Sequence, residues 1–164
     1  MTDMRRVDWI VVHTAAAWDA TRQRVLYQSI DDIRRYHVEH NGWRDIGYHW
    51  VIEHDGKLSP GRPESEPGAH VGGFNAHTIG VCVTGHGDHA DFLPAQKLAL
   101  VGLCTRLCRK HHLSGIRVIG HREAERFGAP PTPKTCPGLL VDMDELRGLV
   151  ADRLDGASGP AEVA

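Results

Sequence analysis

Two histidines and one cysteine, far apart along the chain, are the residues whose types and settings favour metal chemistry. His13 ends the apolar run 9–12, and His121 ends the apolar run 118–120. Cys136 follows a loop with three prolines, which limit the freedom of its backbone. Catalytic zinc usually has three protein ligands and one position left for water. We therefore predict that His13, His121 and Cys136 hold one Zn²⁺ per chain.

The long spacing between these residues indicates a site assembled by the fold, because zinc-finger ligands cluster locally. Two other interpretations stay open on the residues alone. His13 can be a hydrogen-bonded core histidine, and the zinc can be structural in an unrelated α/β enzyme. The other cysteines, Cys82, Cys104 and Cys108, lie in apolar segments and are expected to be buried free thiols.

The composition indicates one globular domain. The chain has 164 residues, of which 41% are hydrophobic and 24% charged. Its net charge of −2 argues against a broad basic surface for nucleic acid or an anionic membrane. Its apolar runs fall short of the roughly 20 residues that span a bilayer. The first residues resemble a β-strand more than a signal peptide, and we expect a monomer without membrane insertion.

The elements that must position the three residues can be predicted from periodicity and turn signals. Strands are expected over 7–13, 47–53, 57–59, 78–84 and 116–119, and helices over 29–41, 94–112 and 142–154. The strand at 116–119 follows a helix, which favours a parallel crossover connection. The fold class is therefore mixed α/β: a central mixed sheet of about five strands flanked by about three helices. We expect one domain over 1–155 and a flexible tail over 156–164.

Four separated motifs carry a resemblance to a known family. They are VVHTAAA, GWRDIGYHWVIEHDGKLSPGR, GAHVGGFNAHTIGVCVTG and VIGHRE followed by PKTCPG. In this order they resemble the zinc N-acetylmuramoyl-L-alanine amidases, which include the T7-type phage lysozymes and the peptidoglycan recognition proteins. The resemblance covers roughly residues 7 to 140. It implies that His13, His121 and Cys136 are the zinc ligands.

The resemblance also implies roles for residues that the composition does not single out. Tyr48 matches a tyrosine needed for activity, and Lys134 matches a lysine that assists the reaction in the phage enzymes. His70 and Asn75 match a loop that lines the substrate groove. Without the resemblance, Tyr48 would be interpreted as an aromatic packed on a strand, Lys134 as a solvated charge and His70 as an ordinary loop histidine.

The residue at position 136 separates branches of the family. The non-catalytic recognition proteins usually have serine there, and the cytosolic wall-recycling amidases usually have aspartate. Cys136 therefore favours a hydrolytic endolysin that cuts the amide between N-acetylmuramic acid and L-alanine in peptidoglycan. Such an enzyme would stay in the host cytoplasm until a holin releases it to the wall. The alternatives are a non-catalytic peptidoglycan-binding module and a regulator that binds an RNA polymerase.

Overall fold

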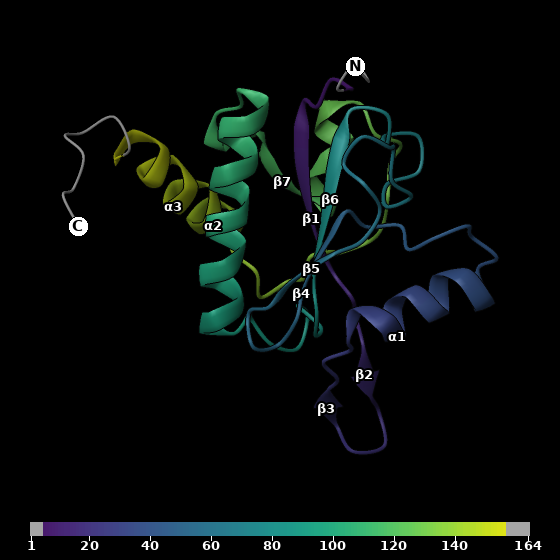
Figure 1. Ribbon diagram of the computed structural model, residues 1–164. Helices are drawn as coiled ribbons and strands as arrows, with labels where there is room; N and C mark the ends of the chain where they lie inside the picture. The colour runs from purple at the N-terminus through teal and green to yellow at the C-terminus, as the bar shows by residue number, and fades with distance from the viewer. Residues whose placement is uncertain (1–4, 157–164) are drawn as a thin grey trace.

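A mixed five-stranded sheet forms the centre of the molecule in a computed structural model that describes residues 5–156 (Figure 1). The strand order is β5-β4-β6-β1-β7, in which β4, β6, β1 and β7 are parallel and β5 is an antiparallel edge. The strand bounds are β1 Trp9–Thr14, β4 Trp50–Ile52, β5 Leu58–Pro60, β6 Thr78–Val83 and β7 Val118–Gly120. The predicted fold class is confirmed, including the parallel pairing of β7 with β1.

Two long helices cover one face of the sheet, α2 (Pro94–His111) and α3 (Met143–Gly156) (Figure 1). Alternate strand residues such as Ile10, Val12 and Val81 pack against these helices in the main hydrophobic core. Because successive strand side chains point to opposite faces, Val11 and His13 lie on the other face. Val11 belongs to a separate small core there. The sheet therefore has one purely structural face and one face available for a site.

The first helix begins and ends where the sequence predicts. Ser29 and Asp32 form a capping box at the start of α1 (Ile30–Arg35). The helix continues as a π-helical turn, Tyr36–His40, and the chain leaves it at Gly42, whose φ is 72°. The predicted helix over 29–41 is confirmed, with a change of helical type in its second half.

Two predicted strands are displaced from their expected bounds. The strand expected over 47–53 is confined to β4, because the backbone of Gly47 is bonded elsewhere. Its N–H donates to His37 Nδ1, and its carbonyl accepts from Ala69. The strand expected over 116–119 is β7, which starts at Val118 after the 3₁₀ turn η2 (Gly115–Arg117). A second 3₁₀ segment, η3 (His121–Phe127), follows β7 directly.

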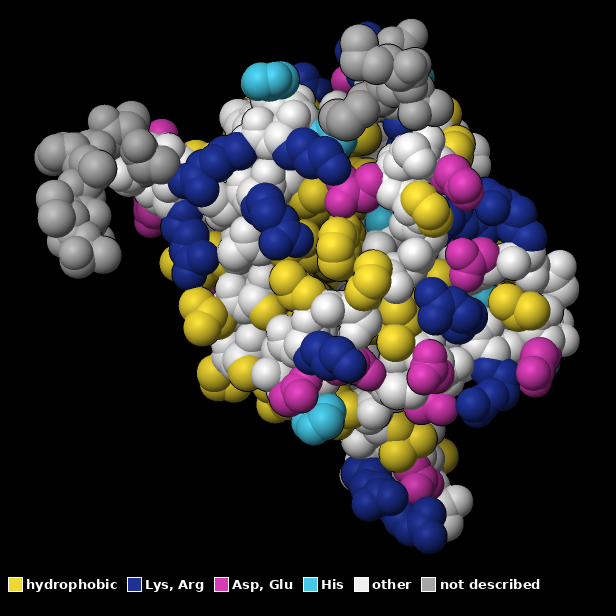
Figure 2. All heavy atoms as spheres, viewed as in Figure 1, with side chains coloured by type: hydrophobic (Ala, Val, Ile, Leu, Met, Phe, Trp, Pro, Cys, Tyr) yellow, Lys and Arg dark blue, Asp and Glu magenta, His cyan; other side chains and the backbone are white. Residues whose placement is uncertain are grey.

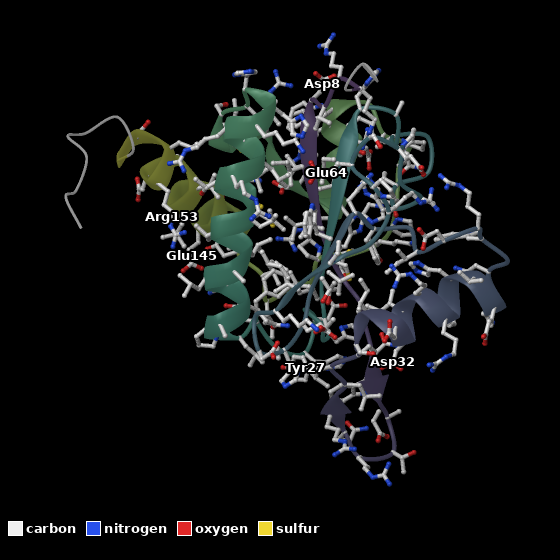
Figure 3. All side chains as sticks on the ribbon, in the orientation of Figure 1. Asp8, Tyr27, Asp32, Glu64, Glu145 and Arg153 are labelled. Atoms are coloured by element: carbon white, nitrogen blue, oxygen red, sulfur yellow. The ribbon has the colours of Figure 1, made fainter. Side chains whose placement is uncertain are left out.

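After β1 the chain forms a small hairpin that the sequence analysis missed. Its strands are β2 (Trp18–Asp19) and β3 (Arg24–Val25), and it projects from the end of the sheet (Figure 1). The Trp18 ring stacks on His89 with ring centroids 3.8 Å apart. Figure 3 labels Tyr27 near the base of the hairpin, close to the start of α1. The stacking of Trp18 on His89, which lies in the connector after β6, supports the hairpin.

The surface shown in Figure 2 has basic and acidic side chains interspersed, with apolar side chains between them. Within residues 5–156, the helices are too short or too polar to cross a membrane. Gly156 is the last residue of α3, so it does not begin a tail. The remainder of the predicted tail, 157–164, lies outside the described residues.

Candidate metal centre

The fold brings His13, His121 and Cys136 together at the carboxyl end of two parallel strands. His13 is the next-to-last residue of β1, and His121 comes directly after β7. In the register of these strands Val12 is opposite Gly120, so the two histidines are neighbours. Their ring centroids are 4.9 Å apart. One ligand atom from each of the three residues lies within 4.8 Å of the other two.

The donor set fits zinc. The Cys136 Sγ is 3.6 Å from His13 Nδ1. Tetrahedral zinc with ordinary Zn–S and Zn–N bond lengths separates a sulfur from a nitrogen ligand by about 3.6 Å. Two imidazoles and one thiolate leave a fourth position free for water, as in catalytic sites. The cluster therefore fits the zinc site that the sequence predicts.

Burial sets the protonation of these groups in favour of metal binding. It holds the pKa of His13 well below its usual value, and the nearby His70, His121 and Lys134 lower this pKa further. Burial, followed by the Lys134 charge, lowers the pKa of His121 to about 4. Both imidazoles are thus neutral at pH 7, with lone pairs available. Burial also raises the pKa of Cys136 to about 11, so a cation must displace its proton.

Hydrogen bonds to Asp88 hold the loop that carries Cys136 against the segment after β6. Asp88 accepts hydrogen bonds from Thr135 Oγ1 and from Leu139 N–H, each at 2.8 Å. A Cβ at Gly87 would overlap the carbonyl of Pro137, so only glycine allows this close approach. The Arg122 guanidinium also donates to backbone carbonyl oxygens of this loop and of the residues that follow it, at Thr135, Gly138 and Val141. The sulfur is therefore positioned by Asp88, Gly87 and Arg122 together.

Tyr48 lies beside the centre, with its ring centroid 5.2 Å from that of His13. Burial raises the pKa of its hydroxyl well above the usual value, and the neighbouring Cys82 and Cys136 contribute in the same direction. Tyr48 packs against the small core that contains Cys82, which lies on β6 opposite His13. Arg62 holds the Tyr48 segment through its backbone N–H and through its side chain, which donates to Ile46 O. Tyr48 is thus a protonated donor at neutral pH.

A cavity of about 420 Å³ opens over the three candidate ligands. Lys134 lies on its exposed rim, two residues before Cys136. His86 and Asp88 also line the cavity. The Asp88 carboxylate in the lining already accepts from Thr135 and Leu139 with its two oxygens. The cavity therefore presents a phenol and an ammonium beside the metal centre, and its carboxylate is engaged in structure.

His70 and Asn75 occupy different positions relative to the cavity. His70 is buried among its lining residues, and its Nδ1 lies 2.9 Å from His13 Nε2. Burial, followed by the nearby His49, holds the pKa of His70 well below its usual value. Asn75 Oδ1 accepts from the backbone N–H groups of His70 and Val71. Asn75 thus fixes the loop that presents His70.

The sequence analysis missed several residues that position the site. Asp88 and His86 lie in the polar connector after β6, a parallel strand whose carboxyl end faces the site. The rule that placed His13 and His121 could have found them. The period-2 alternation of β6 could have placed Cys82 on the same face as His13. His37 accepts from Gly47 N–H across a tertiary contact, which has no local signal in the sequence.

Comparison with known proteins agrees with this arrangement. Residues 3–139 match the family model described as N-acetylmuramoyl-L-alanine amidase. The chain belongs to this family. It is 36% identical over 137 residues to the endolysin of Escherichia phage T7, covering 80% of this chain and 81% of that protein. It is 33% identical over 143 residues to the endolysin of Klebsiella phage KP32, covering 84% and 85%.

A solved structure of the family supports the same fold. The N-acetylmuramoyl-L-alanine amidase LysC from Clostridium intestinale is similar with a TM-score of 0.73 and 25% sequence identity. The similarity covers 88% of this chain and 85% of LysC. The family, the mixed sheet and a His-His-Cys cluster that fits zinc are therefore established together for this chain.

Proposed function

We propose that this chain hydrolyses the amide bond between N-acetylmuramic acid and L-alanine in peptidoglycan, with one Zn²⁺ held by His13, His121 and Cys136. The observation that carries the proposal is the three-ligand cluster at the floor of an open cavity. Membership of the amidase family supports the bond, and the similarity to phage endolysins supports a role in host lysis. In that role the enzyme reaches the wall after a holin opens the host membrane.

The metal supplies Lewis acidity and lowers the pKa of a bound water to about 7. The protein contributes the donors for the charge that develops on the substrate carbonyl oxygen. Tyr48 keeps its proton because its pKa is raised, so its hydroxyl can donate a hydrogen bond to that oxygen. The Lys134 ammonium at the rim adds a positive charge on the same cavity. Removing one such donor typically costs about 10²–10³ in rate.

A chemical analysis of digested wall tests the proposal directly. Purified peptidoglycan incubated with the protein should release stem peptides with free L-alanine amino termini, and the glycan strands should keep their lactyl groups. A chelator should stop the release, and added Zn²⁺ should restore it. Binding to peptidoglycan without new amino termini would contradict the proposal and indicate a recognition module.

A further inference from the structure

A chain of buried hydrogen bonds starts at the metal centre and ends at a backbone carbonyl. His13 Nε2 is 2.9 Å from His70 Nδ1, and His70 Nε2 is 3.1 Å from Thr78 Oγ1. Thr78 Oγ1 in turn lies 2.8 Å from the carbonyl oxygen of Phe74. His13, His70 and Thr78 are all at most 9% exposed, so the chain is screened from water.

The carbonyl at the end of the chain fixes the direction of every proton. Phe74 O can only accept, so the Thr78 hydroxyl donates to it. The Thr78 oxygen then accepts from Nε2–H of His70. A neutral His70 with its proton on Nε2 has a bare Nδ1, which accepts from Nε2–H of His13. His13 is left with a bare Nδ1, the nitrogen that lies 3.6 Å from Cys136 Sγ.

The surroundings of His70 hold its ring in this position. A Cβ at Gly80 on β6 would come within 2.6 to 2.8 Å of three atoms of the His70 ring, so the ring lies directly on the glycine. Asn75 Oδ1 accepts from the His70 and Val71 backbone and fixes the loop. The His70 ring packs on the sheet and has one nitrogen at His13 and the other at Thr78, so its position fixes the orientation of the His13 ring.

We propose that His70 is a positioning residue for metal binding: it accepts from Nε2–H of His13 and thereby presents Nδ1 of His13 to the metal. Thr78 sets the proton position of His70 in the same way. The inference rests on the proposed zinc site, and it gives His70 a role that the resemblance to the family does not. Partners of this kind, which orient a ligating histidine, typically change metal affinity by about 10–100-fold.

Zinc affinity, measured by competition with a chromophoric chelator, tests the proposal. His70→Leu removes the acceptor while keeping a side chain of useful volume, and it should weaken zinc binding by about 10–100-fold. His70→Asn is the matched variant, because its Oδ1 can occupy the place of Nδ1 and accept from His13. It should recover a large part of the lost affinity. Equal affinity in the wild type and His70→Leu would overturn the proposal.

The far end of the chain supplies a second pair of variants. Thr78→Val keeps the shape of the side chain and removes the hydroxyl, whereas Thr78→Ser retains it. We expect Thr78→Val to weaken zinc binding by less than His70→Leu does, and Thr78→Ser to match the wild type. Equal weakening by both Thr78 variants would contradict the proton direction argued above. Thermal unfolding of the metal-free proteins identifies any variant that fails to fold, and the other pair then decides the test.

Two results separate this inference from the proposed function. If the wild type binds no zinc, the proposed metal centre is wrong. If the wild type binds zinc and His70→Leu raises only KM for peptidoglycan at unchanged zinc affinity, His70 contacts substrate, and the positioning role is wrong while the hydrolase stands.

Discussion

The metal centre and the cluster around the half-buried Glu64 both hold polar side chains, but only in the Glu64 cluster is the charge balanced by a cation of the protein. Glu64, which is labelled in Figure 3, accepts from Lys110 Nζ and from Trp50 Nε1, each at 3.0 Å. Burial alone would raise the pKa of Glu64, and these hydrogen bonds outweigh it and lower the pKa. The Glu64 carboxylate is thus already paired with the Lys110 ammonium and needs no further ligand.

The metal centre lacks such internal compensation. Among residues 5–156, no carboxylate is hydrogen-bonded to the buried His13 or His121, and the Lys134 ammonium lowers the pKa of both. The half-buried Cys136 thiol accepts from the backbone N–H of Thr14, and its Sγ lies 3.6 Å from His13 Nδ1. Neutral imidazoles beside a thiol match a site that a divalent cation completes. The comparison teaches that a cluster without its own counter-charge indicates a ligand, whereas a paired cluster indicates structure.

The largest expected effect comes from removing a ligand. Cys136→Ser and His121→Ala should each abolish stoichiometric zinc binding and reduce peptidoglycan hydrolysis to background, because two protein ligands remain. Zinc content and released amino termini are measured on the same samples. Glu64→Gln, in the paired cluster, is the control: it should keep zinc and activity and lose about 1 kcal/mol of stability. Full zinc occupancy in Cys136→Ser would remove that residue from the ligand set.

The next largest effect is a lower turnover rate at unchanged zinc binding. Tyr48→Phe and Lys134→Ala should each reduce kcat by about 10²–10³ because each removes a donor for the developing oxyanion. Both variants should bind zinc like the wild type. Steady-state rates on solubilised peptidoglycan, with zinc content measured in parallel, check the prediction. Wild-type rates in both variants would exclude them from the reaction.

A smaller effect is expected at Asp88, which holds the Cys136 loop by hydrogen bonds. Asp88→Asn replaces one acceptor oxygen with a donor facing Thr135 or Leu139, so the sulfur should be less well held. We expect zinc affinity to fall by about 10-fold, at the low end for residues that orient a ligand. Asp91→Asn, in the same connector but paired with Lys97, serves as the control. An equal change in the two variants would indicate a general charge effect.

The smallest effect is on the pH dependence of stability. Burial, partly opposed by a hydrogen bond to the Glu66 carbonyl, lowers the pKa of His49 from its ordinary value of 6.5 to about 4. The unfolded chain therefore binds this proton first, and stability that is full above pH 6.5 is lost as the pH falls toward 4. The slope is about 1.4 kcal/mol per pH unit for one such group.

The matched variant for this effect is His49→Asn, whose Oδ1 can still accept from Gly80 N–H, as His49 Nδ1 does at 2.9 Å. Denaturant unfolding of the metal-free proteins between pH 7 and 5 should give a shallower decline for the variant. Parallel curves for the two proteins would show that His49 does not carry the acid sensitivity.

The sequence predicts the parts of the fold and site that follow from local periodicity. His13 and His121 end apolar runs, and parallel strands present their carboxyl ends at one edge, so their proximity was foreseeable. Ser29 and Gly42 mark the ends of the first helix. Tyr48 and Lys134 were found only through the resemblance to the family, because a strand tyrosine and a loop lysine have many ordinary explanations.

The rest depends on contacts between segments that have no shared local pattern. The hydrogen bond from His13 to His70 joins residues 57 positions apart, and His70 lies in a loop without periodicity. The hydrogen bonds from the Cys136 loop to Asp88 cannot be predicted from local sequence, because they join distant segments. The same holds for the stacking of Trp18 on His89. The shortening of β4 follows from the tertiary bond between Gly47 and His37. These features are fixed by packing, which the local sequence does not encode.

Titration of the metal-free protein with Co²⁺ tests the metal centre most directly, because a cobalt–thiolate bond gives a charge-transfer absorption that nitrogen and oxygen ligands do not. We predict saturation at one equivalent with this absorption present, its loss in Cys136→Ser, and its displacement by one equivalent of Zn²⁺. Saturation without the thiolate absorption, or the same titration in Cys136→Ser, would contradict a centre made by two imidazoles and one sulfur.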